Sequence, residues 1–125
     1  MDFEDIMVSD VQVEPGASGD SYRFAFMLSR VPERFWPERF NSAYNSQTGL
    51  RRIELNENAL RIALAEAEVG AYTETVRQAV AKANADYRAE MTRRVTEQQQ
   101  RLDSEQERRA HAESLRLKAK QALGI

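Results

Sequence analysis

The feature that most constrains this chain is an unbroken helical pattern that begins near Ala71 and continues to Leu123. The segment contains no glycine and no proline, the two residues that most disfavour a helix interior. At 1.5 Å per residue, a helix of this length would extend roughly 80 Å, whereas a domain of this size is only about 30 Å across. We therefore expect the second half of the helix to protrude from the domain or to be covered by a partner.

Apolar side chains form a stripe along the first half of this helix. They recur every three or four residues, at Tyr72, Val76, Val80, Ala83, Tyr87, Met91 and Val95. The mean step is slightly above 3.6 residues, whereas a left-handed coiled coil needs about 3.5. The pattern favours a helix that lies on a sheet over one that winds around a second helix.

A long polar stretch, residues 94–114, overlaps the end of this stripe. Val95 and Leu102 are its only apolar side chains larger than alanine. Acid-before-base pairs at a spacing of four residues stabilise a helix by about 0.2–0.5 kcal/mol each. Such pairs are Glu90/Arg94, Glu97/Arg101 and Glu105/Arg109. We interpret this stretch as a solvated helical spacer.

An apolar stripe returns near the end of the helix, surrounded by Arg and Lys side chains. We call residues 112–125 the tip. Its candidate partner-binding residues are Leu115, Arg116, Ala119, Ala122 and Leu123. The sequence thus predicts a body, residues 1–95, that includes the first half of the helix. Residues 96–125 then supply the charged spacer and the basic tip.

The front of the chain has the alternation that is typical of strands. In residues 21–29, large apolar side chains occupy every second position from Tyr22 to Leu28, which predicts a strand with one apolar face. Residues 6–13 predict an earlier strand, whose apolar phase shifts between Val8 and Val11 as it would at a β-bulge. The turn residues of EPGASGD between them predict an antiparallel hairpin.

A short helix and a second hairpin are predicted next. Trp36, Phe40 and Tyr44 are spaced by four residues and share one helical face, and Pro37 suits the first turn of a helix. Residues 51–64 predict a hairpin around the turn residues 56–58. The alternative for this region is a helix that starts at Ala59, because ALRIALAEAE contains good helix formers.

The predicted fold class is therefore α+β. We expect a two-layer sandwich with a four-stranded antiparallel sheet, the order ββαββα along the chain and a long C-terminal helix that protrudes. Both helices should cover the sheet face that carries the alternating aromatic side chains. The predicted core residues are Tyr22, Phe24, Phe26, Trp36, Phe40, Val76, Val80 and Tyr87.

No pattern in the sequence indicates catalysis or metal binding. The chain has no cysteine, and its glycines form no phosphate-binding loop. The single histidine, His111, has no second imidazole near it, and we interpret it as a surface residue. No apolar run approaches the roughly 20 residues that cross a bilayer. We expect a cytoplasmic protein that is not an enzyme, with no cofactor, no metal and no membrane contact.

The stretches FMLSRVPERFWPERF and AVAKANADYR resemble a group of short bacterial proteins of unassigned function. The matching positions are Leu28, Ser29, Pro32, Trp36, Phe40, Asn84 and Tyr87. The resemblance covers about residues 24–88 and leaves the tip outside it. It implies the two-layer fold and no particular activity.

For function, the sequence favours a non-catalytic interaction or assembly protein, such as an adaptor. Its long C-terminal helix would bind a protein partner or a second copy. The alternative is a nucleic-acid-associated accessory protein that uses the arginines of this helix, although the acids among them weaken a phosphate-binding surface. The strand YRFAFML also resembles the aromatic strand of RNA-recognition modules, but it lacks their glycine, and the core needs its aromatic side chains.

Overall fold

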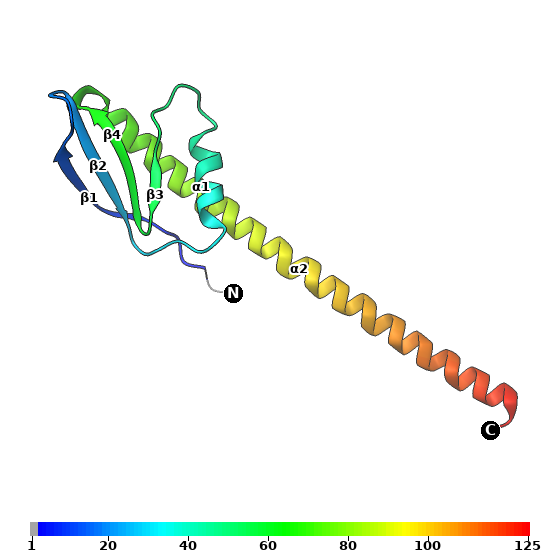
Figure 1. Cartoon of the computed structure of the whole chain (residues 1–125). Helices are drawn as coiled ribbons and strands as arrows, with labels where there is room; N and C mark the ends of the chain where they lie inside the picture. Colours follow the sequence, from blue (N-terminus) through cyan, green and yellow to red (C-terminus); the bar gives the residue numbers. More distant parts are fainter. Residues whose placement is uncertain (1–2) are drawn as a thin grey trace. The chain divides into compact units, whose positions relative to one another are not determined.

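The computed structural model describes residues 3–125 and shows an α+β fold (Figure 1). Its elements are β1 (Val8–Pro15), β2 (Ser21–Leu28), α1 (Trp36–Tyr44), β3 (Glu54–Asn56), β4 (Ala59–Ala65), a short 3-10 helix (Glu66–Glu68) and α2 (Val69–Leu123). The strands form one antiparallel sheet in the order β1-β2-β4-β3. The predicted fold class and the order ββαββα are confirmed.

The first hairpin joins β1 and β2. The predicted irregularity is present as a shift of register between Val8 and Asp10, but β1 begins at Val8 and leaves the buried Ile6 outside the strand. At the turn, the Gly16 N–H donates to the Ser21 carbonyl at 2.8 Å. A Cβ atom at Gly16 would lie 2.6 Å from that oxygen, so the turn requires glycine at this position.

The second hairpin joins β3 and β4, and the alternative of a helix that starts at Ala59 is wrong. The turn between the two strands places Glu57 at a φ of 56°, in the left-handed region. Along β4, Leu60, Ile62 and Leu64 are buried. The residues between them, Arg61 and Ala63, are exposed. Burial of these aliphatic side chains on the sheet outweighs the local helix propensity, because packing decides strand stability.

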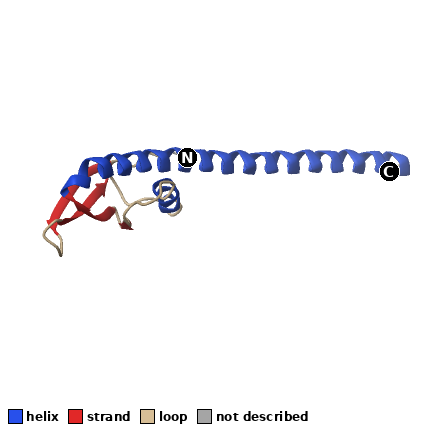
Figure 2. Cartoon of the chain, turned by 90° about the horizontal axis from the view of Figure 1, so that it is seen from above, coloured by secondary structure: helices blue, strands red, loops and turns tan. Residues whose placement is uncertain are grey.

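One face of the sheet packs against α1 and the beginning of α2 to form the core (Figure 2). The predicted core residues that are buried are Phe24, Phe26, Trp36, Phe40, Val76, Val80 and Tyr87. The rings of Trp36 and Phe40 stack with their centroids 5.7 Å apart. The core thus combines the aromatic face of α1 with the stripe of α2.

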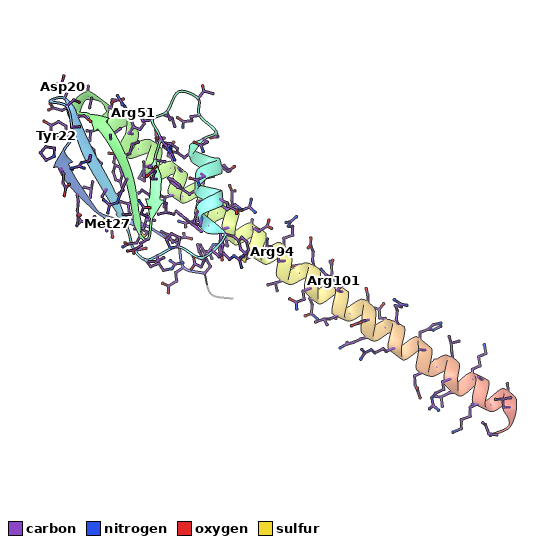
Figure 3. All side chains as sticks on the ribbon, viewed as in Figure 1. Asp20, Tyr22, Met27, Arg51, Arg94 and Arg101 are labelled. Carbon is purple, nitrogen blue, oxygen red and sulfur yellow. The ribbon has the colours of Figure 1, made fainter. Side chains whose placement is uncertain are left out.

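Tyr22 is the exception, and the prediction that it belongs to the core is wrong. Its side chain is 36% exposed. It lies at the turn end of β2, where it pairs with Pro15 of the edge strand β1, near Asp20 (Figure 3). On the same face, Val11 and Val13 of β1 are exposed as well. The helices therefore leave the β1 side of this face uncovered.

The chain divides into two compact units, Met1–Arg88 and Ala89–Ile125. The first unit contains the sheet, α1, the beginning of α2 and all the buried side chains named above. The second unit contains the remainder of α2 and the final two residues. α2 is one helix of 55 residues and begins at Val69, slightly earlier than the expected Ala71.

Candidate interaction surfaces

The second unit exposes its apolar side chains. Every residue from Thr92 to Ile125 is exposed. In the predicted partner-binding set, Leu115 is 52% and Leu123 is 74% exposed. Leu117 is exposed as well but lies outside the predicted partner-binding set. Only its large apolar side chain could have indicated from the sequence that it belongs there. A helix with so little burial is marginal in water, so contact with a partner would stabilise it.

The tip combines an apolar face with charged flanks. Helical spacing places Leu115, Ala119 and Ala122 on one face. Arg116 lies beside this face, and its Nε donates to both carboxylate oxygens of Glu113, at 3.1 and 3.0 Å. This interaction holds the pKa of Glu113 below its usual value. The predicted residues therefore lie together on the tip, with Arg116 engaged by its helical neighbour.

The spacer forms fewer ion pairs than its sequence predicts. Glu90 pairs with Arg94 at 3.2 Å and with Arg93 at 2.9 Å; Arg94 and Arg101 are labelled in Figure 3. Among the described residues, the other two predicted pairs, Glu97/Arg101 and Glu105/Arg109, do not form. Exposed pairs of this kind contribute little stability, so the spacer remains a solvated helix without them.

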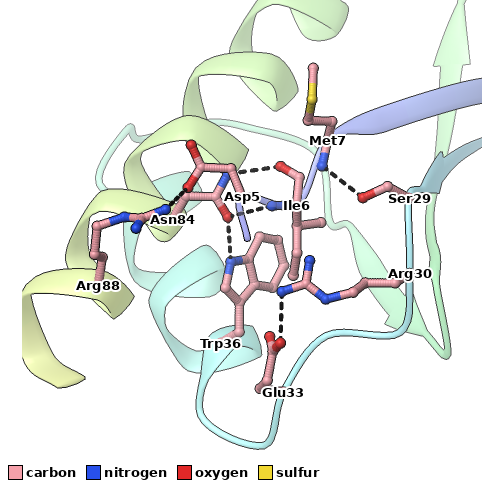
Figure 4. A network of polar contacts seen from close by, with 9 residues as sticks. All are labelled: Asp5, Ile6, Met7, Ser29, Arg30, Glu33, Trp36, Asn84 and Arg88. Carbon is pink, nitrogen blue, oxygen red and sulfur yellow. Dashed lines mark hydrogen bonds and ion pairs between the residues drawn. The ribbon is translucent and has the colours of Figure 1, made fainter. Parts of the chain in front are cut away.

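The first unit contains a buried polar hub at Asn84, which is only 6% exposed. Its Oδ1 accepts hydrogen bonds from the Trp36 Nε1–H at 2.9 Å and from the Ile6 N–H at 3.1 Å (Figure 4). Its Nδ2 donates to the Ile6 carbonyl at 2.7 Å. The Asn84 amide thus pairs with Ile6 as a neighbouring strand would, which attaches the segment before β1 to α2. No functional role was predicted for Asn84.

Other residues near this hub hold the N-terminal segment in place. Arg88 donates to the Asp5 carboxylate at 2.7 Å. The ring centroids of Phe3 and Tyr87 are 4.7 Å apart. The guanidinium groups of Arg30 and Arg88 lie over the Phe3 ring, 5.2 and 5.4 Å from its centroid. The segment before β1 is therefore fixed along α2 by polar, aromatic and cation–π contacts.

A groove runs between this N-terminal segment and α2. Its volume is about 460 Å³. Phe26, Val76 and Val80 form its buried side, and Met7, which is 65% exposed, and Ala81 lie at its open rim. Its lining is largely apolar, which suits the apolar side chains of a protein segment. The sequence did not predict this groove, because it depends on how far α2 covers the sheet.

A second polar cluster holds the loop before β3. The Tyr44 hydroxyl donates to the Arg51 carbonyl, and the Arg51 N–H donates to the Tyr72 hydroxyl at 3.0 Å. Burial, with a smaller contribution from Tyr72, raises the pKa of Tyr44 to about 12. The Arg51 Nε donates to Glu68 at 2.9 Å. This bond and the bond from the Ala65 N–H hold the pKa of Glu68 below its usual value. Tyr44 is protonated at neutral pH and acts as a structural donor.

The described residues offer no assembled metal site. Within residues 3–125, no group of three or more His, Cys, Asp or Glu side chains could hold a metal ion. His111 is exposed in the second unit. In the same part of the chain, no helix has both the length and the apolar character needed to cross a membrane.

No family model matches the chain, and no curated protein or solved structure matches it. The resemblance to short bacterial proteins therefore stays a prediction.

Proposed function

We propose that this chain is a non-catalytic interaction or assembly protein whose C-terminal helix binds a second copy or another protein. The exposure of every residue from Thr92 to Ile125 is the observation that carries this proposal. Single exposed apolar residues are ordinary on protein surfaces, but Leu115 and Leu123 lie on the same side of the tip helix, with Ala119 between them. Apolar anchors at helical spacing are what a hydrophobic groove recognises when it binds a helix.

A nucleic-acid-associated role is the alternative, and it has less support. The second unit carries eight Lys/Arg and six Asp/Glu, so its charge is nearly balanced. Arg93 is engaged by Glu90, and Arg116 is engaged by Glu113. Phosphate recognition depends on a surplus of basic side chains and falls steeply as salt rises. Salt-sensitive binding of the full chain to duplex RNA or DNA would favour this alternative.

The mass of the protein in solution tests the proposal. We expect the full chain to exceed its monomer mass of 14.3 kDa or to co-purify with a protein partner. The variant with both Leu115→Glu and Leu123→Glu should lose this association, because it places charges on the apolar side of the tip.

The matched control makes the same chemical change on the spacer. Val95→Glu with Leu102→Glu alters two exposed side chains outside the tip and should keep the association of the full chain if the tip alone makes the contact. If all three proteins have the same mass and the same protein partners at every concentration, the proposal fails.

A further inference from the structure

The spacing of apolar residues changes along α2 where the second unit begins. From Met91, ten positions recur at alternating steps of four and three residues and end at Leu123, where the helix stops and Gly124 takes a φ of 76°. We call these ten positions the seam. Their steps average close to 3.5 residues, the repeat of helices that wind around each other. Six seam positions are apolar: Met91, Val95, Leu102, Ala112, Ala119 and Leu123. The seam therefore suits contact with a second helix.

The other four seam positions are polar, and they select the orientation of two paired helices. They are Gln98, Glu105, Arg109 and Arg116. In a parallel pair of identical helices, Glu105 would face Glu105 and Arg109 would face Arg109, so like charges would repel. In an antiparallel pair centred on Glu107, Glu105 faces Arg109 of the second copy. The two-fold axis makes this favourable contact twice.

The same antiparallel arrangement places every apolar residue of the seam opposite another apolar residue. Residues equally distant from Glu107 on its two sides lie opposite each other. The matched pairs are Met91/Leu123, Val95/Ala119 and Leu102/Ala112. A slip of one heptad would instead place Leu102 opposite Glu105, or Arg109 opposite Ala112. One register is therefore better than its neighbours for both charge and apolar contact.

The structure leaves the seam available to a second helix. Val95 and Leu102 are 55% and 47% exposed. Among residues 3–125, neither Glu105 nor Arg109 forms an ion pair, so both charges can meet a partner in a second copy. The seam from residue 91 to residue 123 extends over roughly 50 Å at 1.5 Å per residue. Contact over this length would stabilise a helix that is marginal when solvated.

Contacts within and beside the seam set the strength of this pairing. Leu115 lies beside the seam opposite Arg101 of the second copy, and the methylene groups of an arginine can cover a leucine. Arg116 lies in the seam, but Glu113 of its own helix already engages its charge. The two Arg108 side chains meet near the two-fold axis, and this like-charge contact weakens the pair. The association should therefore depend on protein concentration.

We infer that the second unit pairs with the same unit of another copy as an antiparallel two-stranded coiled coil centred on Glu107. The inference rests on the proposed function and names a second copy as the partner. Because Val95 and Leu102 face the tip of the second copy, Val95→Glu with Leu102→Glu should lose the association, as the tip variant does. If this spacer variant keeps an association that the tip variant loses, the coiled coil is overturned and the proposed function stands.

Charge exchange tests the orientation and the register. Glu105→Arg places two arginines opposite each other, and Arg109→Glu places two glutamates opposite each other, so neither variant should dimerise alone. Their equimolar mixture should form a heterodimer, because each chain then meets the opposite charge. The matched control Glu107→Arg makes the same change of charge on the outer side of the helix and should keep the dimeric mass. A dimeric mass for both Glu105→Arg and Arg109→Glu alone overturns the inference.

Cysteine crosslinking gives an independent test, because the chain has no native cysteine. Val95→Cys and Ala119→Cys replace exposed residues, and a disulfide requires Cβ atoms about 3.8 Å apart. Oxidation of their mixture should give a covalent dimer. Each variant alone, and the control mixture of Val95→Cys with the outer-side Ser114→Cys, should give none.

The other outcomes of the oxidation separate the inference from the proposed function. A dimer formed by Val95→Cys alone would mean parallel helices, and a dimer formed by Ala119→Cys alone would mean that tips pair with tips. Either result overturns the antiparallel coiled coil and leaves the proposed function standing. A monomeric mass for the unmodified chain, with no protein partner, overturns both.

Discussion

At the scale of single residues, Asn84 is the side chain on which the first unit depends most. It is the one buried polar residue among the described residues, and it joins α1, α2 and the N-terminal segment through three hydrogen bonds. Because Ile6 and Asn84 lie 78 residues apart in the chain, their contact forms only in the folded state. Removal of either Asn84 or its partner Trp36 should therefore weaken the whole unit.

Trp36→Ala should lower the free energy of unfolding by about 3–5 kcal/mol, the usual cost of emptying the site of a large buried aromatic. The side chain has no exposed surface. Urea unfolding followed by circular dichroism measures the effect. Trp36→Phe, which removes the N–H but keeps an aromatic ring, should cost less. An unchanged unfolding midpoint for Trp36→Ala would contradict its buried position.

Asn84→Ala should lower the free energy of unfolding by at least about 2 kcal/mol, because the Trp36 N–H and both polar groups of the Ile6 backbone lose their partner. The matched control is Asn41→Ala, an exposed position on α1, which should change stability by less than about 0.5 kcal/mol. The same urea experiment compares the two. Equal effects of the two substitutions would show that Asn84 has no special structural role.

At the scale of elements, the edge of β1 is protected against pairing with another strand. Pro15 has no backbone N–H that could donate to a further strand. The Val11 N–H already donates to the carboxylate of Asp10 at 2.8 Å. Proline and charged side chains are common devices for blunting an exposed edge. The apolar face of β1 and its neighbouring groove are therefore better suited to bind a partner than the edge itself.

Glu68, in the 3-10 helix that precedes α2, should make the stability of the protein depend on pH. The pKa of Glu68 is lowered in the folded state, mainly by its hydrogen bond from Arg51 and to a smaller extent by that from the Ala65 N–H. The stabilisation is therefore fully present above the ordinary value of 4.5 and is lost as pH falls through the lowered pKa. Glu68→Gln should lower the unfolding midpoint at pH 7, and the difference should shrink below pH 4.5. Glu66→Gln is the control. A difference that persists at low pH would contradict the ion pair.

Removal of the chain after Gln100 should leave the first unit folded. All deleted residues are exposed, so the deletion removes no buried side chain from the core. We expect the free energy of unfolding of the first unit to change by less than about 0.5 kcal/mol, as for exposed positions in general. Urea unfolding followed by Trp36 fluorescence reports on this unit. A loss of several kcal/mol would mean that residues 101–125 support the core.

The sequence predicted the elements better than the contacts between them. The alternation of Phe24 and Phe26 and the spacing of Trp36 and Phe40 are local patterns, so they identified strands, helices and a buried face. The exposure of Tyr22 depends on where the helices stop covering the sheet, and no local pattern records that. The groove and the hydrogen bonds of Asn84 also depend on how distant elements pack together, so no local pattern predicted them. The tip could be predicted because its stripe is local.

At the scale of the whole molecule, the two compact units differ in the sign of their small net charge. Residues 1–88 carry fourteen Asp/Glu and ten Lys/Arg, whereas residues 89–125 carry six Asp/Glu and eight Lys/Arg. The buried side chains belong to the first unit, while the second unit is an exposed helix that ends in the tip. One chain therefore combines a folded unit that has a groove with a helix that gains stability when it is covered.

Hydrogen exchange of residues 101–125 at two protein concentrations tests most directly whether this helix is covered by a second copy. Backbone amides of a solvated helix exchange quickly, and burial by a partner slows them. We predict slow exchange in the tip at high concentration and faster exchange on dilution, while the first unit exchanges equally slowly in both samples. The Leu115→Glu and Leu123→Glu variant should exchange quickly at both concentrations. Fast exchange throughout the tip of the unmodified chain at both concentrations would contradict self-association through the tip.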